Sequence, residues 1–155
     1  MESPNQVSRN EDEEDLFLSL GSEASGRAAV VEGDGYSVWL YLTAPGQQRP
    51  VADGIVCSLV PPTDELVSPY GDGGPPVLLR KHASDMAVQT GFSAGDIGLL
   101  FSQDGHSVAV ILRGEPWAYI SHTENRGYSK GLSLDGPFGH PWDQEEFDRL
   151  FERGV

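Results

Sequence analysis

Three short apolar runs between Ile97 and Ser121 form the clearest pattern in the chain. The first two are separated by Asp104-Gly105 and the last two by Gly-Glu-Pro. Asp-Gly between apolar runs favours a two-residue type I′ hairpin turn, in which both central residues have positive φ. The pattern predicts a three-stranded antiparallel meander in the middle of one core.

Further strands are predicted upstream, at residues 28–31, 36–43 and 53–60. The first two flank Glu32-Gly33-Asp34-Gly35, which is another hairpin-like junction. The run from Tyr36 to Leu42 is apolar on both faces, so we expect it to be covered on both sides, as in a sandwich, in a barrel or beneath a helix. The strand at 53–60 could pair back with it across the polar loop 44–52.

Regular structure is not expected between residues 61 and 76, where proline and glycine are frequent. Residues 77–80 could form a brief strand, and residues 82–90 are compatible with either a helix or a strand. Residues 122–131 are expected to be a polar loop.

A short amphipathic helix is predicted at the C-terminus. Asp143 has the position of an N-cap, with Glu146 at the third helical position, and Trp142 and Phe147 have the spacing of a hydrophobic staple. Gly154 provides the end of the helix. The face expected to dock on the sheet consists of Phe147, Leu150 and Phe151.

Together these elements predict a mainly β fold at the border with α+β. We expect a single antiparallel β sandwich or partly open barrel of about six to eight short strands, with the C-terminal helix packed on it. Residues 1–15 read as a disordered acidic tail and residues 16–155 as one globular domain. The apolar run at 16–20 follows acidic residues, which suits a helix start; alternatively, it is an acidic-hydrophobic segment that docks into a partner's groove.

Composition narrows the choice of partners. The chain has 155 residues, which suits one domain, and a net charge of −14. Such a charge disfavours nucleic acid and anionic membranes, whose phosphates require Lys or Arg, and is compatible with a basic protein partner. No apolar run approaches the length of a membrane helix, and the first residues lack the features of a signal peptide, so a cytoplasmic protein is expected. The single cysteine, Cys57, excludes an internal disulfide and is expected to be a buried thiol.

One motif suggests catalysis, but its surroundings do not. Gly127-Tyr128-Ser129-Lys130-Gly131 matches the Gly-x-Ser-x-Gly pattern of a nucleophile elbow, and Asp135 and His140 follow in the order Ser, acid, His. That elbow needs a strand before the serine and a helix after it, whereas here a polar loop precedes the serine and Leu-Ser-Leu-Asp-Gly-Pro follows it. We therefore predict no catalytic residue.

Cofactor and metal sites are not predicted either. The four histidines (His82, His106, His122 and His140) fall on different loops or turn edges, and no zinc-type spacing occurs. Asp53, Asp96 and Asp104 lie at predicted strand edges, where turn capping accounts for them. Neither a dinucleotide-binding nor a phosphate-binding glycine motif occurs between a strand and a helix.

The remaining candidates belong to a binding surface in the last third of the chain, where aromatic and polar residues gather. Trp, Tyr and Arg are enriched at the centres of interfaces. The function predicted from the sequence is therefore that of a small, non-enzymatic protein-interaction module. The alternative is a small-molecule-binding domain or small hydrolase with a pocket near residues 61–76 and 126–142. The residues predicted to bind a partner are Trp117, Arg126, Tyr128, His140 and Trp142.

Overall fold

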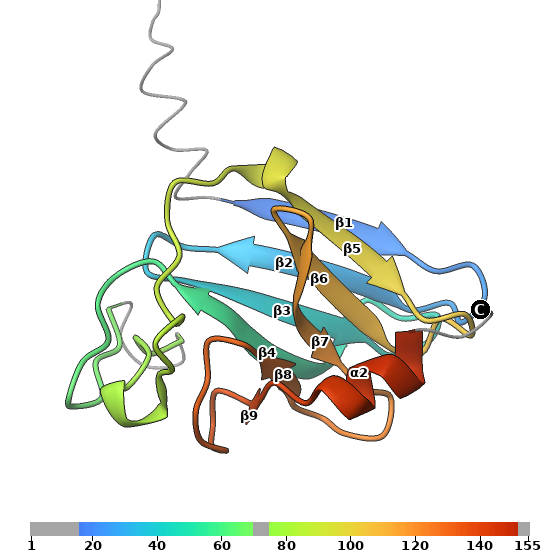
Figure 1. Ribbon diagram of the computed structural model, residues 1–155. Helices are drawn as coiled ribbons and strands as arrows, with labels where there is room; N and C mark the ends of the chain where they lie inside the picture. The colour runs from blue at the N-terminus through green and yellow to red at the C-terminus, as the bar shows by residue number, and fades with distance from the viewer. Residues whose placement is uncertain (1–15, 70–74, 152–155) are drawn as a thin grey trace, which may run out of the picture.

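Two β-sheets face each other in the computed structural model, which describes residues 16–69 and 75–151 (Figure 1). The first sheet has the antiparallel order β1-β2-β3-β4, and the second has the order β5-β6-β7-β8-β9. The last pair, β8 and β9, is parallel. The strands of the first sheet are β1 (Phe17–Gly21), β2 (Ala28–Gly33), β3 (Ser37–Thr43) and β4 (Pro50–Ser58). Those of the second are β5 (Ile97–Phe101), β6 (Val108–Leu112), β7 (Glu115–Ile120), β8 (Gly127–Ser129) and β9 (His140–Pro141).

The predicted mainly β architecture is confirmed. The described residues form nine strands, of which β9 has only two residues, and two 3₁₀ turns at Arg80–His82 and Ala94–Asp96. The helix α2 (Gln144–Phe151) follows β9. The sandwich is not a closed barrel, because β1 and β5 are the outermost strands of their sheets. Among residues 16–69 and 75–151, no helix is long and apolar enough to cross a membrane.

The main core lies between the sheets, where strand alternation turns apolar side chains inward. β3 contributes to it from one face and is covered on the other, where Trp39 packs against Phe138 with ring centroids 6.2 Å apart. The expectation that this strand is buried on both faces is therefore confirmed. Cys57 is fully buried in the core, and burial raises the pKa of its thiol to about 12. The largest fully buried members of the core are Leu40, Leu42, Ile120, Val31, Val38, Val56, Val108 and Val110.

The central meander is confirmed, but its tight turn is at the other junction. Arg113 and Gly114, with φ of 51° and 85°, connect β6 to β7 directly. The Asp104-Gly105 junction is instead a longer loop, in which only Gly105 has positive φ. The Asp104 carboxylate accepts a hydrogen bond from the His106 N–H at 3.0 Å. A type I′ turn needs positive φ at both central residues, and Asp104 does not have it. The type I′ prediction for residues 104–105 is therefore wrong.

Other local predictions are corrected by sheet pairing. Residues 17–21 form an edge strand and not a helix start, because they pair in register with β2 and Leu18 packs against the main core. β8 lies inside the segment 122–131 that the sequence suggested was a loop, and β4 starts three residues earlier than predicted. Residues 77–79 and 83–90 contain isolated bridges only. The predicted acidic tail at residues 1–15 lies outside the described residues.

The C-terminal helix is confirmed with its predicted start. The Asp143 carboxylate accepts a hydrogen bond from the Glu146 N–H at 3.2 Å, and the Trp142 and Phe147 rings lie 5.1 Å apart. The helix packs on the outer face of the second sheet (Figure 1), against Tyr119 of β7 and Tyr128 of β8. Its predicted end at Gly154 lies outside the described residues.

Two β-bulges join the sheets. The register passes from Val38↔Cys57 to Trp39↔Ile55, so Val56 is the extra residue of β4. It passes likewise from Val110↔Ala118 to Ile111↔Pro116, so Trp117 is the extra residue of β7. A bulged residue is left without a ladder partner. Here the Val56 carbonyl accepts a hydrogen bond from the Trp117 indole at 3.0 Å, which links the two bulges across the core.

The backbones of β4 and β8 also approach each other closely beside this hydrogen bond. We call this backbone approach, together with the hydrogen bond, the seam. A Cβ atom on Gly54 of β4 would lie 2.8 Å from the Gly127 Cα, which no ordinary side chain allows. The Asp53 N–H donates to the Asn125 carbonyl at 3.1 Å, and the Ile55 N–H donates to the Phe138 carbonyl at 3.0 Å. β4 is therefore bonded directly to the chain around β8, and this side of the sandwich is held together by the backbone.

Replacing Gly54 with alanine should separate β4 from β8. We expect Gly54→Ala to lower the free energy of unfolding by about 2–4 kcal/mol, because the nearest atoms that a Cβ would meet all belong to the Gly127 backbone. Gly98→Ala is the matched control, because Gly98 lies in the exposed edge strand β5 and its Cβ would lie 3.8 Å from Ile111. Urea denaturation of both variants measures the difference; equal losses would contradict the seam.

The hydrogen bond between the bulges can be tested by removing one indole N–H. Trp117→Phe should cost about 1–3 kcal/mol, because the lost bond is buried and the smaller ring leaves space in the core. Trp142→Phe should cost under about 1 kcal/mol, because its indole N–H bonds to the exposed Gln144 side chain. A larger loss for Trp142→Phe in the same denaturation experiment would contradict this assignment.

Candidate functional site

A shallow depression of about 650 Å³ lies where β8, β9 and the first turn of α2 meet. Four carboxylates line it and no Lys or Arg does, so its charge is strongly negative. We call it the acidic–aromatic surface. Its lining residues are Glu124, Tyr128, Asp135, His140, Pro141, Trp142, Asp143, Gln144 and Glu145.

The base of this surface is a stack of aromatic rings on Tyr119, which is fully buried. The Tyr128 ring lies parallel to the Tyr119 ring at 4.7 Å, and the Trp142 ring meets it edge-on at 5.1 Å. The Tyr119 hydroxyl donates to the Asp143 carbonyl at 2.8 Å, next to the first turn of α2. Stacked and edge-on rings of this kind stabilise their own geometry. The polar groups above them are therefore carried on a rigid support.

His140 lies between two carboxylates on this support. Its Nδ1 is 2.8 Å from Asp135 Oδ1, and its Nε2 is 2.9 Å from Glu124 Oε1. The Tyr128 hydroxyl donates to the second oxygen of Glu124 at 2.6 Å. A neutral imidazole carries one N–H and the imidazolium carries two, so both carboxylates accept a hydrogen bond only from the protonated ring. Burial and the hydrogen bond to Glu124 raise the pKa of Tyr128, which keeps its hydroxyl a donor.

The serine of the Gly-x-Ser-x-Gly motif is not part of this network. The structure brings Asp135 and His140 together, but Nε2 of His140 faces Glu124. Ser129 is fully buried, and its hydroxyl donates to the Val56 carbonyl at 2.8 Å. Its oxygen also accepts from the Gly131 N–H at 2.9 Å. Ser129 therefore supports the seam between the sheets, and its hydroxyl points toward Val56.

The other predicted partner-binding residues have separate environments. Trp117 is 7% exposed, and its indole belongs to the bulge contact described above. Arg126 is exposed and lines a different depression, beside β4, and its guanidinium donates to the Pro137 carbonyl at 3.0 Å. The Lys130 ammonium lies over the Trp142 ring, 4.9 Å from its centroid. Of the five predicted residues, Tyr128, His140 and Trp142 line the depression.

Sequence reasoning missed the acids of this site. Glu124 lies in the loop before β8, and its role depends on the contact with His140, which is 16 positions away. The sequence analysis assigns Asp143 only to the N-cap of the helix and does not single out Glu145. The available signal was the density of acids around the aromatic residues 138–142.

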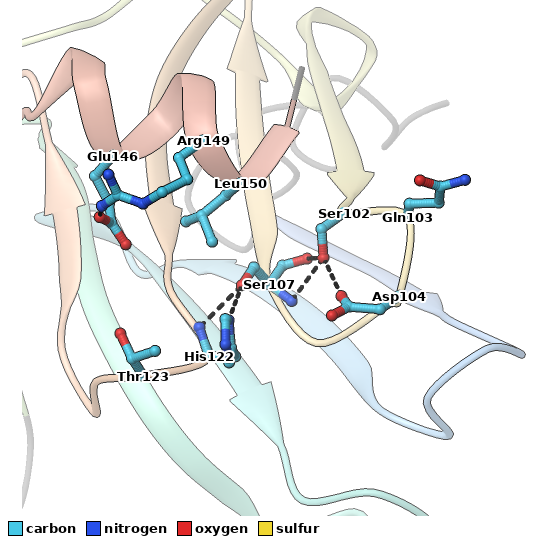
Figure 2. A pocket seen from close by; sticks show the side chains of 9 residues that line it. All are labelled: Ser102, Gln103, Asp104, Ser107, His122, Thr123, Glu146, Arg149 and Leu150. Atoms are coloured by element: carbon cyan, nitrogen blue, oxygen red, sulfur yellow. Dashed lines mark hydrogen bonds and ion pairs between the residues drawn. The ribbon is translucent and has the colours of Figure 1, made fainter. Parts of the chain in front are cut away.

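A second depression, of about 600 Å³, lies beside the later part of α2 (Figure 2). Charges of both signs line it, and they contact each other. Arg149 pairs with Glu146 on the helix. The Ser107 oxygen accepts from the His122 N–H at 2.9 Å and lies 3.2 Å from the ring Nδ1. Its lining residues are Ser102, Gln103, Asp104, Ser107, His122, Thr123, Glu146, Arg149 and Leu150.

The histidines remain apart. His82 packs on Phe138 with ring centroids 5.7 Å apart, and His106 accepts a hydrogen bond from the Arg27 guanidinium at 3.1 Å. Within residues 16–69 and 75–151, no group of three His, Cys, Asp or Glu side chains could hold a metal ion. The loop at 61–69 lines neither of the two depressions described here.

Asp104, in the loop at the second depression, should make the stability of the fold depend on pH. Hydrogen bonds from the His106 N–H and the Ser102 hydroxyl lower the pKa of Asp104. A carboxylate with a lowered pKa in the folded state contributes stability above the pKa of the unfolded chain, and this contribution is lost as the pH falls. Asp104→Asn should therefore destabilise the protein at pH 7 and have a smaller effect below about pH 4. Urea denaturation at both pH values checks this, with exposed Asp85→Asn as the control; a difference that is independent of pH would contradict it.

Comparison with known protein families, with curated proteins and with solved structures finds no match to this chain in any of the three.

Proposed function

We propose that this protein is a protein-interaction module whose acidic–aromatic surface binds a basic segment of a partner protein. The observation that carries the proposal is the lining of the depression, which contains four carboxylates and no Lys or Arg. A partner's guanidinium or ammonium group would be attracted by this charge and could donate hydrogen bonds to the carboxylates. The net charge of −14 adds long-range attraction for the same class of partner.

The carboxylates differ in how far they are already engaged. Glu124 and Asp135 are held by His140 and, for Glu124, by Tyr128. Asp143 and Glu145 are exposed at the start of α2, and Asp143 uses one oxygen for the helix cap. We therefore assign Glu124 and Asp135 to shaping the surface, and Asp143 and Glu145 to meeting the basic partner.

A rigid acceptor surface favours this function, because binding then costs little ordering on the side of the module. We expect the module to act in the cytoplasm, where a lone buried thiol such as Cys57 is stable.

The proposal can be tested with a fluorescein-labelled octa-arginine peptide and anisotropy measurements at low salt. The double variant Asp143→Asn/Glu145→Gln removes two charges and keeps an N-cap residue at position 143. The dissociation constant of the complex between this variant and octa-arginine should be about tenfold higher than that of the unmodified protein, because two negative charges next to the bound cations are lost. The control, Glu65→Gln/Asp85→Asn, removes two exposed charges elsewhere and should change the constant by less than about twofold.

Equal weakening by the two double variants would show that only the overall charge attracts the peptide, and would overturn the assignment to this surface. Failure of the unmodified protein to bind octa-arginine at low salt would overturn the proposed function. A labelled octa-glutamate peptide should show no binding.

A further inference from the structure

The outer edge of β1 has backbone groups that no strand of the described sheet uses. The Leu16 carbonyl accepts from the Gly33 N–H at 2.8 Å, and the Ser22 N–H donates to the Arg27 carbonyl at 2.8 Å. Along a strand of an antiparallel pair, residues that bond to the partner strand alternate with residues that do not. Phe17, Ser19 and Gly21 therefore direct their N–H and C=O groups away from β2. β1 is an edge strand of its sheet (Figure 1).

This edge lacks the local features that usually prevent strand addition. Such features include proline, lysine and bulges. The sequence of β1 is Phe-Leu-Ser-Leu-Gly, and its register with β2 is uninterrupted. Phe17 is 60% exposed and Leu20 is 45% exposed, so the edge also offers apolar side chains. An incoming strand would find both hydrogen-bonding groups and apolar contact along five residues.

Charge determines which strand the edge accepts. Glu32 is exposed directly opposite Phe17, and the five residues Glu11 to Asp15, all acidic, precede β1 in the sequence. Burial, together with the negative charges of Glu32, Asp53 and Asp34, raises the pKa of Tyr41 to about 12. These acids give this face of the sheet a negative potential. The end of β1 that begins at Phe17 is therefore the acidic end.

A second copy of the chain is a poor occupant for the same reason. Each copy would bring a net charge of −14 to the contact, and like charges repel when two such surfaces meet. The acidic residues therefore disfavour self-association and leave the edge to a strand of opposite charge.

We propose that the β1 edge binds an extended segment of a partner protein as an additional antiparallel strand, with the segment's Lys and Arg residues at the end that meets Phe17. Main-chain hydrogen bonds give affinity in this mode of recognition, and side chains give specificity. The site is separate from the acidic–aromatic surface, which lies on the other sheet, and the inference does not depend on the function proposed for that surface.

The test uses the full chain and the peptide Thr-Val-Thr-Val-Thr-Lys-Arg-Lys. Amide hydrogen exchange by NMR should slow about tenfold or more at Phe17, Ser19 and Gly21 when the peptide is bound, because these N–H groups become hydrogen-bonded. Leu18 and Leu20, which already face β2, should change little. The peptide Thr-Val-Thr-Val-Thr-Glu-Asp-Glu should have no effect at the same concentration.

A pair of variants at one position tests the edge itself. Ser19→Pro removes an outward N–H, a place where an edge strand tolerates proline, and should weaken peptide binding about tenfold. Ser19→Thr keeps the N–H and should bind within about twofold of the unmodified protein. Thermal denaturation confirms that both variants are folded; if Ser19→Pro is not, the exchange pattern of the unmodified chain decides.

Three results would overturn the proposal: protection at the other edge, β5, in place of β1; equal binding by folded Ser19→Pro and Ser19→Thr; or slowed exchange at β1 that depends on protein concentration without peptide. The last result would assign the edge to a second copy. With this peptide at about 0.15 M salt, where the Debye length is about 8 Å, Asp143→Asn/Glu145→Gln should show the same slowed exchange at Phe17, Ser19 and Gly21 as the unmodified protein. The exchange at β1 therefore tests this edge independently of the acidic–aromatic surface.

Discussion

The hydrogen bond between the Trp117 indole and the Val56 carbonyl is the contact on which the arrangement of the two sheets depends. Both residues are the extra members of β-bulges, so the carbonyl of Val56 is not needed for pairing with β3. The same carbonyl accepts from the Ser129 hydroxyl. A buried carbonyl with two lone pairs is thus satisfied twice from the opposite sheet, and this orients β4, β7 and β8 relative to each other.

The acidic–aromatic surface is a consequence of this arrangement. With β8 fixed beside β4, Tyr128 stacks on the buried Tyr119, and the parallel pairing of β8 and β9 places His140 next to Tyr128. The helix then covers Tyr119 through Phe147 and brings its acidic first turn to the same place. Residues that contact each other at the surface come from a loop, a two-residue strand and a helix start. The charged groups of the surface are therefore positioned by the packing of the aromatic side chains beneath them.

The elements that sequence analysis predicted well are those whose signals are local. The start of α2 could be predicted because the cap and the staple lie within six residues of each other, from Trp142 to Phe147. The meander and β3 could be predicted from runs of apolar residues between turns. The bulges at Val56 and Trp117 could not, because a bulge is defined by the register against another strand. Trp117 therefore read as a candidate for binding a partner, whereas the structure places its indole in the core.

The same limit applies to the site. Asp135 and His140 were noticed as members of a motif that lacked its structural context, and their pairing is real, but Glu124 takes the place that a catalytic serine would need. Nothing in the spacing of Glu124 and His140 indicates that they meet, because the contact depends on β8 and β9 running side by side. Tyr128 and His140 were selected for their chemistry, and their mutual packing became visible only in three dimensions.

The seam also determines how the sandwich can fluctuate. One side is closed by backbone contact between Gly54 and Gly127, while the opposite side ends in β1 and β5, whose outer edges pair with no other strand of the described residues. Partial opening of a protein begins where the fewest contacts must be broken. The sheets should therefore separate first along β1 and β5, with β4 and β8 acting as the hinge, so that transient access to the interior is confined to one side of the molecule.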